Sequence, residues 1–210
     1  MNPEEVLKII GEHKIVAIVR TQDAHEAWES ALAVIEGGLP VVEVSLTTPR
    51  ALATIEKLAT RTRGVIGAGT VLAVSDVHKV VEAGATFIVT PNLNPDIVSA
   101  ALTAGLLVGP GVFTATECHQ AVELGAHLLK LFPASSAGIP AMNSLSDPFP
   151  GAKWLPTGGI TLENFTDWLS AGAFAVGMGS ALTRGDPERV RARAKMISTS
   201  LDNTPYMNGN

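Results

Sequence analysis

One pattern recurs five times along the chain and restricts the folds that it can adopt. In each copy a helical stretch ends at a glycine and an apolar run follows at once; the glycines are Gly38, Gly84, Gly105, Gly125 and Gly172. Glycine readily takes the left-handed conformation that closes the last turn of a helix. Each copy therefore predicts a helix that leads directly into a buried strand.

Residues that favour helix starts lie between these strands. Three dipeptides predict an N-cap followed by proline at the first helical position: Thr48-Pro49, Asn94-Pro95 and Asp186-Pro187. Two pairs have the spacing of a capping box: Asp23 with Glu26, and Thr114 with Glu117. We therefore expect a helix in each interval, and a short first helix over residues 3–12.

Together these signals predict strands near residues 14–19, 41–46, 64–68, 86–90, 106–109, 127–132, 153–156 and 174–178. Eight apolar strands alternating with helices are typical of a (β/α)8 barrel, the TIM barrel. We predict that residues 1–210 form a single α/β domain of this type with a short N-terminal helix, and that the tail after Leu201 is frayed. An open doubly wound sheet is the alternative, but the first strand–helix turn has no G-x-G-x-x-G fingerprint.

The charge and the cysteine content exclude several classes of protein. The chain has 15 Lys and Arg against 20 Asp and Glu, and no basic stripe, so we expect no nucleic-acid partner. No apolar run approaches the roughly 18 residues of a membrane helix, and the first residues lack the pattern of a signal peptide. The single cysteine suits a reducing compartment. We expect a cytoplasmic protein without a membrane partner; the five histidines show no metal-ligand spacing.

The predicted strand at 127–132 carries Lys130 among apolar residues. Alternation along a strand places Lys130 on one face with Leu128 and Phe132, and places Leu129 and Leu131 on the other. A buried amine loses its proton more easily than an exposed one and becomes a nucleophile toward carbonyl groups. Lys130 is therefore a candidate to form an imine with a keto acid.

Glu43 lies in the middle of the predicted strand at 41–46, where an unbonded carboxylate is costly to bury. Two strands of one barrel face the same interior, so Glu43 and Lys130 can meet there. They supply an acid/base and a nucleophile, the minimum for imine chemistry; a purely structural ion pair is the alternative. Arg20 ends the first strand at the predicted mouth, where its guanidinium either binds a carboxylate or is solvated.

Two glycine-containing loops follow the last two predicted strands. Thr157, Gly158 and Gly159 follow the seventh strand, and Gly179 and Ser180 follow the eighth and enter a helix. Loops at these two places form the usual phosphate site of this barrel, because their backbone N–H groups point at the ligand. Glycines in a single loop often mark only a turn. Both loops together favour a phosphate site, with Thr157 as a further substrate-binding candidate.

Several segments resemble the 2-keto-3-deoxy-6-phosphogluconate (KDPG) aldolases, a family that includes 4-hydroxy-2-oxoglutarate and 2-keto-3-deoxy-6-phosphogalactonate aldolases. The two most specific segments are Leu-Lys-Leu-Phe-Pro at 129–133 and Pro-Thr-Gly-Gly-Ile at 156–160. The others are residues 15–20, 42–49, 66–71, 88–91 and 176–181, so the resemblance covers nearly the whole chain.

The resemblance implies a class I aldolase that needs no metal or other cofactor. Such an enzyme cleaves a phosphorylated 2-keto-3-deoxy acid to pyruvate and glyceraldehyde 3-phosphate, and homotrimers are usual in the family. It implies that Lys130 is the Schiff-base lysine and Glu43 the general acid/base. The other implied contacts are Thr70, Pro91 and Phe132 to the pyruvyl group, and Gly158, Gly159 and Ser180 to the phosphate. Without the resemblance, Thr70 and Pro91 need only end their strands.

One departure affects the substrate. Some members carry an arginine where this sequence has Thr47, and others have the arginine that is Arg20 here. This difference makes Arg20 the expected ligand of the substrate carboxylate and leaves the gluconate and galactonate epimers open. Two further functions fit the same residues: a phosphosugar isomerase or epimerase with Glu43 as base, and a non-catalytic phosphosugar-binding protein.

Overall fold

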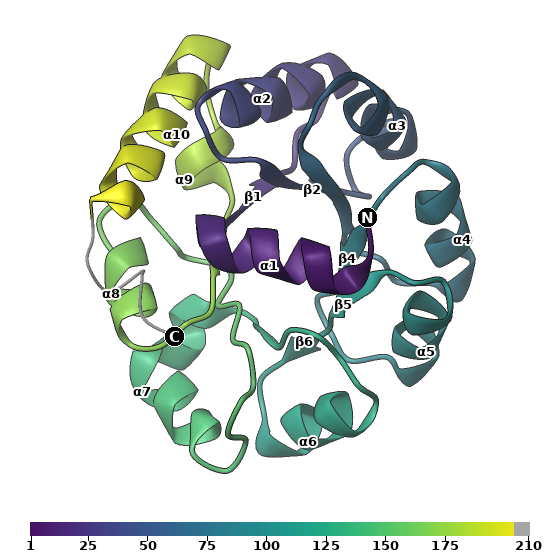
Figure 1. Cartoon of the computed structure of the whole chain (residues 1–210), viewed down its shortest axis with the longest axis vertical. Coiled ribbons are helices and arrows are strands. Elements are labelled where there is room, and N and C mark those ends of the chain that lie inside the picture. Colours follow the sequence, from purple (N-terminus) through teal and green to yellow (C-terminus); the bar gives the residue numbers. More distant parts are fainter. Residues whose placement is uncertain (204–210) are drawn as a thin grey trace.

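Parallel strands alternate with helices throughout the part of the chain that the computed structural model describes, residues 1–203 (Figure 1). The strands are β1 (Ile15–Val19), β2 (Val41–Ser45), β3 (Val65–Gly69), β4 (Phe87–Val89), β5 (Leu107–Gly109), β6 (Gly111–Val112), β7 (Lys130–Leu131) and β8 (Val176–Met178). The helices are α1 (Pro3–His13), α2 (Ala24–Glu36), α3 (Ala51–Arg61), α4 (Val74–Glu82), α5 (Pro95–Thr103), α6 (Ala115–Glu123), α7 (Ala134–Ser146), α8 (Phe165–Ser170), α9 (Ser180–Thr183) and α10 (Pro187–Asp202).

Six of these strands form one parallel sheet in the order β5-β4-β3-β2-β1-β8, and β6 pairs with β7 separately. The predicted α/β class and the short N-terminal helix are confirmed. The predicted strand at 153–156 is wrong as a strand, because it contributes only a single bridge between Trp154 and Leu129. Pro156 has no N–H to donate, so one bond of the ladder is missing there, although the Thr157 N–H still donates to the Leu131 carbonyl at 3.0 Å.

A second proline divides the segment after α5. Pro110 separates β5 from β6, and the prediction had only one strand here, at 106–109. The proline has no N–H, but its carbonyl oxygen still accepts a hydrogen bond of 3.0 Å from the backbone N–H of Lys130. The chain therefore continues along β7 after this break, and Lys130 is fixed at the first position of β7.

The helix boundaries follow the predicted capping residues with one exception. Asn94, Asp186 and Asp23 cap α5, α10 and α2, and Thr114 forms a complete capping box with Glu117. The five predicted helix-end glycines have φ values of 73° to 97°. The prediction of a frayed tail after Leu201 is wrong at Asp202, which is the last residue of α10. For residues 204–210 the prediction lies outside the described chain.

The exception is Thr48-Pro49, which does not start a helix. The α3 helix begins at Ala51, after Arg50 with a φ of 54°. Thr48 is buried and its hydroxyl accepts a hydrogen bond of 3.4 Å from the backbone N–H of Thr21. The Thr48 hydroxyl therefore binds the loop after β1 and does not cap α3, and a turn precedes the helix.

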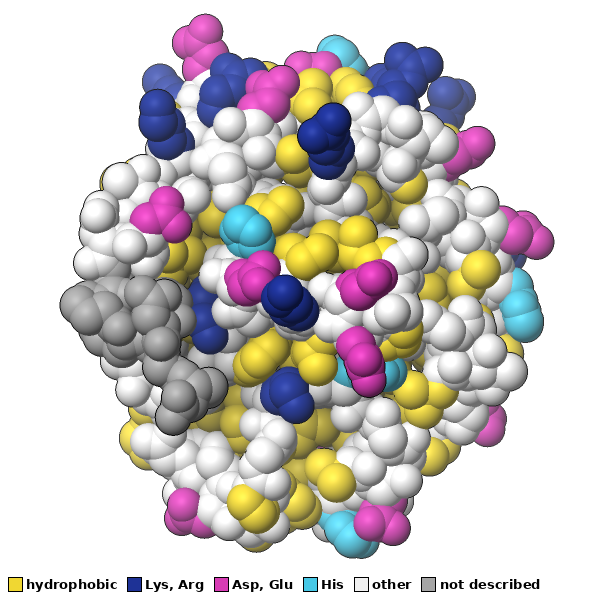
Figure 2. Space-filling model, viewed as in Figure 1, with side chains coloured by type: hydrophobic (Ala, Val, Ile, Leu, Met, Phe, Trp, Pro, Cys, Tyr) yellow, Lys and Arg dark blue, Asp and Glu magenta, His cyan; other side chains and the backbone are white. Residues whose placement is uncertain are grey.

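The inner faces of the strands form a core of their own beneath α1. Its strand residues include Val16, Val41, Val65 and Phe87, and α1 adds Val6 and Ile10. In Figure 1, α1 lies across the centre of the ring of helices, and Figure 2 shows charged side chains on its outer surface. Since these strand residues lie toward the N-terminal ends of the strands, α1 closes that end and leaves the carboxyl ends open.

In the described part of the chain, no helix combines the length and the apolar character that crossing a bilayer requires.

Candidate active site

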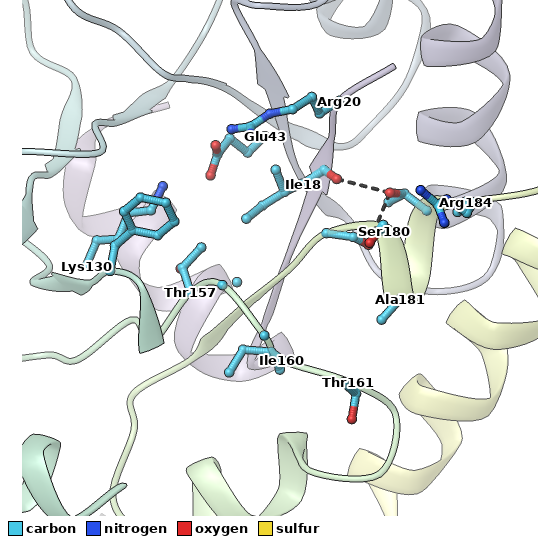
Figure 3. A pocket seen from close by; sticks show the side chains of 16 residues that line it. Ile18, Arg20, Glu43, Lys130, Thr157, Ile160, Thr161, Ser180, Ala181 and Arg184 are labelled. Atoms are coloured by element: carbon cyan, nitrogen blue, oxygen red, sulfur yellow. Dashed lines mark hydrogen bonds between the residues drawn. The ribbon is translucent and has the colours of Figure 1, made fainter. Parts of the chain in front are cut away.

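A cavity of about 450 Å³ opens at the carboxyl ends of the strands. Its wall includes the end of β1, the middle residue of β2, the first residue of β7, and the loops before α8 and α9 (Figure 3). The predicted site residues that line it are Arg20, Glu43, Lys130, Phe132, Thr157, Gly158, Gly159, Gly179 and Ser180. Sequence segments up to 160 residues apart therefore meet in one place, as the barrel prediction requires.

Lys130 points into this cavity from β7. Its side chain is buried, with 5% of its surface exposed, and Figure 3 shows it directed toward Glu43. The ammonium nitrogen lies 5.2 Å from the centroid of the Phe132 ring. Leu128 belongs to the inner core, and Leu129 and Leu131 belong to the outer core under the helices. The predicted alternation of faces is confirmed.

Glu43 is the most deeply buried ionisable group of the cavity. Only 1% of its surface is exposed, and its Oε2 atom has no hydrogen-bond partner in the described chain. Burial raises the pKa of the Glu43 carboxyl above its ordinary value of 4.5, although the positive charges of Lys130 and Arg20 oppose the rise. This carboxyl therefore holds a proton to a higher pH than an exposed glutamate does.

Gly69 on β3 provides the space that the Glu43 side chain occupies. A Cβ atom at position 69 would lie 1.7 Å from Glu43 Oε1 and 2.5 Å from its Cδ. Gly67, two residues earlier on the same face, makes room for Phe87 in the same way. The inward positions of β3 are thus small where the side chains of the adjacent strands are large.

Arg20 is held at the rim by hydroxyl groups. Its Nε and Nη2 atoms lie 3.4 Å from Ser45 Oγ and 3.2 Å from Thr70 Oγ1. Ser45 Oγ in turn contacts Thr47 Oγ1 at 2.8 Å and Thr70 Oγ1 at 3.0 Å. Arg20 makes no ion pair with any other described residue, so its charge is available to an anion in the cavity.

Thr70 and Pro91 lie beside the cavity and are absent from its wall. Thr70 has a left-handed backbone with a φ of 59°, a strained conformation for a β-branched residue, and reaches the cavity only through its bond to Arg20. The backbone of Pro91 packs against Gly111, where a Cβ atom would lie 2.3 Å from the Pro91 carbonyl. Their contact with a substrate stays a prediction.

The two glycine loops line the side of the cavity away from β2. Gly158 and Gly159 have φ values of 91° and 83°, which a side chain would disfavour. The backbone N–H groups of Gly158, Gly159 and Ser180 have no acceptor within residues 1–203. Thr157 is buried and packs against Gly177. Free N–H groups converging on a cavity are typical of an anion site.

Sequence reasoning missed seven residues of the wall: Ile18, Ile160, Thr161, Gly177, Ala181, Thr183 and Arg184. Ile18 could have been predicted, because alternation along β1 places this residue on the same face as Arg20. Arg184 could not, because it follows the one-turn helix α9 and no motif marks it. Only the path of the chain after β8 brings Arg184 to the cavity.

The similarity to known proteins extends over most of the chain. The sequence profile of the KDPG and KHG aldolase family matches residues 6–193. A 2-dehydro-3-deoxy-6-phosphogalactonate aldolase of Escherichia coli is 36% identical over 81% of this chain and 84% of its own. A 2-dehydro-3-deoxy-phosphogluconate aldolase of Pseudoalteromonas atlantica is 32% identical over 89% of this chain and 91% of its own.

A solved structure adds chemical detail. The KDPG aldolase of Legionella pneumophila, captured with pyruvate as a covalent carbinolamine intermediate, superimposes with a TM-score of 0.84. It is 28% identical and covers 91% of this chain and 97% of its own. The fold and the cavity define an α/β enzyme whose site combines a buried amine, a buried carboxyl and loops with backbone N–H groups that have no acceptor within residues 1–203. The chain belongs to the KDPG and KHG aldolase family of lyases.

Gly69→Ala is expected to displace the Glu43 carboxyl and lower kcat about 100-fold in aldol cleavage, because a shift of about 1 Å in a reacting group can cost this much. Steady-state kinetics and a crystal structure of the variant check this. Gly109→Ala is the milder control, since its new Cβ atom would meet the Leu128 Cβ atom at 3.3 Å, a close contact that requires Leu128 to shift by only a few tenths of an ångström. Equal kcat values for Gly69→Ala and the wild type would refute the steric role of Gly69.

Glu43→Gln is expected to stabilise the protein at neutral pH. The folded state of the wild type keeps a proton that the unfolded chain releases above the ordinary pKa of 4.5. The wild type therefore loses stability as pH rises from 4.5 through the raised pKa, by about 1.4 kcal/mol for each unit of pKa difference. Glutamine is neutral and has no such loss.

Urea denaturation at about pH 4 and about pH 8 measures this difference. The exposed Glu56, changed to Gln on α3, serves as the control and should leave the pH dependence of the wild type unchanged. A Glu43→Gln variant with the same pH dependence as the wild type would show that Glu43 is not protonated by burial.

Proposed function

We propose that this protein is a class I aldolase that cleaves 2-dehydro-3-deoxy-6-phosphogluconate, or its galactonate epimer, to pyruvate and D-glyceraldehyde 3-phosphate. The observation that carries the proposal is the buried amine of Lys130, directed toward the buried carboxyl of Glu43, whose Oε2 atom has no hydrogen-bond partner within residues 1–203. Neither group has a packing role that a leucine would not fill better. Relatives named for both epimers match the chain at similar identity, so either substrate, and also 4-hydroxy-2-oxoglutarate, fits the proposal.

In the proposed mechanism, the neutral amine of Lys130 attacks the C2 carbonyl of the substrate. The carbinolamine that forms loses water and becomes a protonated imine. The C3–C4 bond then breaks, and its electron pair moves into the imine, so that an enamine of pyruvate remains on Lys130 while glyceraldehyde 3-phosphate leaves. Protonation at C3 and hydrolysis of the imine release pyruvate and restore the amine.

Glu43 moves protons in three of these steps. It donates a proton to the leaving hydroxyl of the carbinolamine, accepts the C4 hydroxyl proton during bond cleavage, and returns a proton to C3 of the enamine. The same group must be an acid and a base in turn, which favours a pKa between that of an exposed glutamate and neutrality. Its pKa, raised by burial, supports this role.

The remaining residues are proposed to hold the substrate along the cavity. Arg20, which has no ion-pair partner in the described chain, binds the C1 carboxylate with the help of Thr70. Phe132 and Thr157 of the wall are proposed to flank the keto group. Pro91, which is not part of the wall, is proposed to contact the pyruvyl group as the family resemblance implies. The phosphate is proposed to lie on the backbone of Gly158, Gly159, Gly179 and Ser180.

We propose further that residues 1–210 form one closed eight-stranded barrel. The inner core supports this, because it contains Leu128, Leu155 and Ala175 beside the residues of β1 to β5. Backbone hydrogen bonds also connect residues 153–157 to the segments on either side. The Leu155 N–H donates to the Leu129 carbonyl at 2.8 Å, and the Gly177 N–H of β8 donates to the Pro156 carbonyl at 2.9 Å. Closure places Lys130 and Glu43 on opposite sides of one interior.

Incubation with pyruvate and borohydride should attach one reduced pyruvyl group to the wild type, and peptide mass analysis should find it on Lys130. Lys130→Met should give no adduct, because no other amine is held in the cavity among the described residues. Lys14→Met is the control and should keep the adduct. Lys14 is partly buried, but its amine lies 5.4 Å from the centroid of the Phe174 ring and is not part of the cavity wall. A wild type without an adduct would overturn the proposed activity.

The same variants separate the alternative functions. An isomerase or epimerase that uses Lys130 only as a positive charge should keep activity in Lys130→Arg, whereas an imine-forming enzyme should lose it. A non-catalytic binding protein should bind the phosphorylated acids without turnover, and Glu43→Gln would change no rate.

A homotrimer is proposed as the assembly, and exposed apolar side chains at the open end support it. Leu72 follows β3 and Phe113 follows β6, with 58% and 44% of their surfaces exposed. Light scattering should give a particle of three chains, and Phe113→Asp should dissociate it because an interface core disfavours a buried charge. Val122→Asp, equally exposed on α6, should leave the trimer intact; a wild-type particle of one chain would refute the assembly.

A further inference from the structure

The positive charges of the cavity are separated into two groups. Arg20 and Lys130 lie near Glu43, at the end proposed for the keto acid. Arg184 is the remaining lysine or arginine in the described wall, and Figure 3 shows it beside Ser180 at the other end. Gly158, Gly159, Gly179 and Ser180 of the two glycine loops line the same wall. A ligand that spans the cavity therefore meets a cation at each end.

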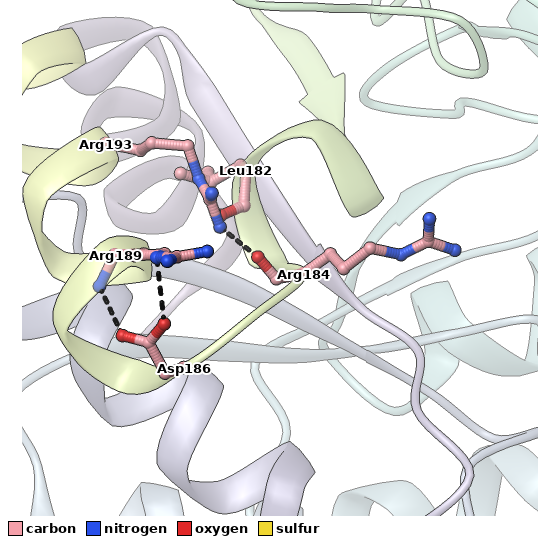
Figure 4. A network of polar contacts seen from close by, with 5 residues as sticks. All are labelled: Leu182, Arg184, Asp186, Arg189 and Arg193. Carbon is pink, nitrogen blue, oxygen red and sulfur yellow. Dashed lines mark hydrogen bonds and ion pairs between the residues drawn. The ribbon is translucent and has the colours of Figure 1, made fainter.

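The Arg184 guanidinium has no acceptor in the described part of the chain, although its neighbours are engaged. Arg189 pairs with Asp186 at 3.1 Å. Arg193 donates from Nε to the Leu182 carbonyl at 3.0 Å and from Nη2 to the Arg184 carbonyl. Figure 4 shows the Arg184 side chain extending away from Asp186, Arg189 and Arg193. Arg184 is exposed and belongs to the cavity wall, so its charge is free to meet a ligand there.

The backbone at Arg184 is fixed from several sides. Its N–H donates to the Ser180 carbonyl at 3.2 Å, which places Arg184 one turn beyond Ser180. Arg193 binds the carbonyls on either side of Thr183, and Ser30 Oγ donates to the Thr183 carbonyl at 2.9 Å. The Thr183 hydroxyl lies 3.1 Å from the carbonyls of Ile18 and Gly179. The base of the Arg184 side chain is thus tied to the loop that contains Ser180.

A phosphate in this loop needs more than neutral donors. A phosphate monoester carries about −1.5 to −2 charges at pH 7, since its second pKa is about 6. The α9 helix has only four residues, so its dipole is short, and the free N–H groups of Gly158, Gly159 and Ser180 carry partial charges. A guanidinium offers a full charge and paired N–H donors that match phosphate oxygens.

We infer that Arg184 binds the terminal phosphate of the substrate and makes the enzyme selective for phosphorylated over non-phosphorylated 2-keto-3-deoxy acids. This inference rests on the proposed function, because it requires that the keto acid occupies the end of the cavity near Lys130. Arg184 then determines which chain terminus is accepted, while Lys130 and Glu43 carry out the bond cleavage. Arg193 acts as a positioning residue through the Arg184 carbonyl.

The test compares Arg184→Gln with the wild type on two substrates that differ only in the phosphate, 2-keto-3-deoxy-6-phosphogluconate and 2-keto-3-deoxygluconate. The KM for the phosphorylated acid should rise about 10- to 100-fold, the range of a lost charge-assisted contact. The KM for the non-phosphorylated acid and the pyruvate–borohydride adduct should not change. Arg184→Lys should recover part of the loss, and higher salt should raise the wild-type KM more than that of Arg184→Gln.

Arg189→Gln is the matched control, an exposed arginine five residues further along that pairs with Asp186 and is absent from the cavity wall. It should leave both KM values unchanged. An Arg184→Gln variant with a wild-type KM for the phosphorylated acid would overturn the inference, and so would equal losses on both substrates. A wild type that forms no pyruvate adduct would instead refute the proposed function, so the two failures are distinguishable.

Discussion

The desolvation of one carboxyl group and one amine constrains the rest of this structure. Glu43 and Lys130 are each at least 95% buried, and the Glu43 pKa is raised because burial outweighs two nearby positive charges. Such a pair is expensive to bury and contributes little to stability. The proposed chemistry explains its burial, because a desolvated amine attacks carbonyl groups more readily than a hydrated one, and a desolvated carboxyl keeps a proton that it can donate.

The architecture supports this pair by leaving one end of the strands open. The α1 helix covers the other end with Val6 and Ile10, which continue the inner core. Gly69 leaves the space that Glu43 occupies, so the carboxyl is positioned by the absence of a side chain on the adjacent strand. Pro110 interrupts the strand beside β7, yet the hydrogen bond from Lys130 N–H to its carbonyl keeps the lysine in place.

The cavity is also organised by charge. Arg20 at one end and Arg184 at the other have no ion-pair partner among the described residues. Arg20 donates to the hydroxyl groups of Ser45 and Thr70, and the Arg184 carbonyl accepts a hydrogen bond from Arg193. An elongated substrate with an anionic group at each end would be aligned with its reactive carbonyl between Lys130 and Glu43. The two arginines that would bind and orient the substrate thus lie apart from Lys130 and Glu43, the groups proposed to break the bond.

Local patterns in the sequence determined the alternation of helices and strands, most helix starts, and the shared face of Leu128, Lys130 and Phe132, because capping and strand periodicity depend on near neighbours. They also identified Glu43, since a carboxylate inside an apolar run is conspicuous. Tertiary structure alone decided that α3 begins after Thr48, which bonds to Thr21, and that Arg184 reaches the cavity. Both depend on contacts between segments distant in the chain, and no local pattern records which distant backbone a side chain will meet.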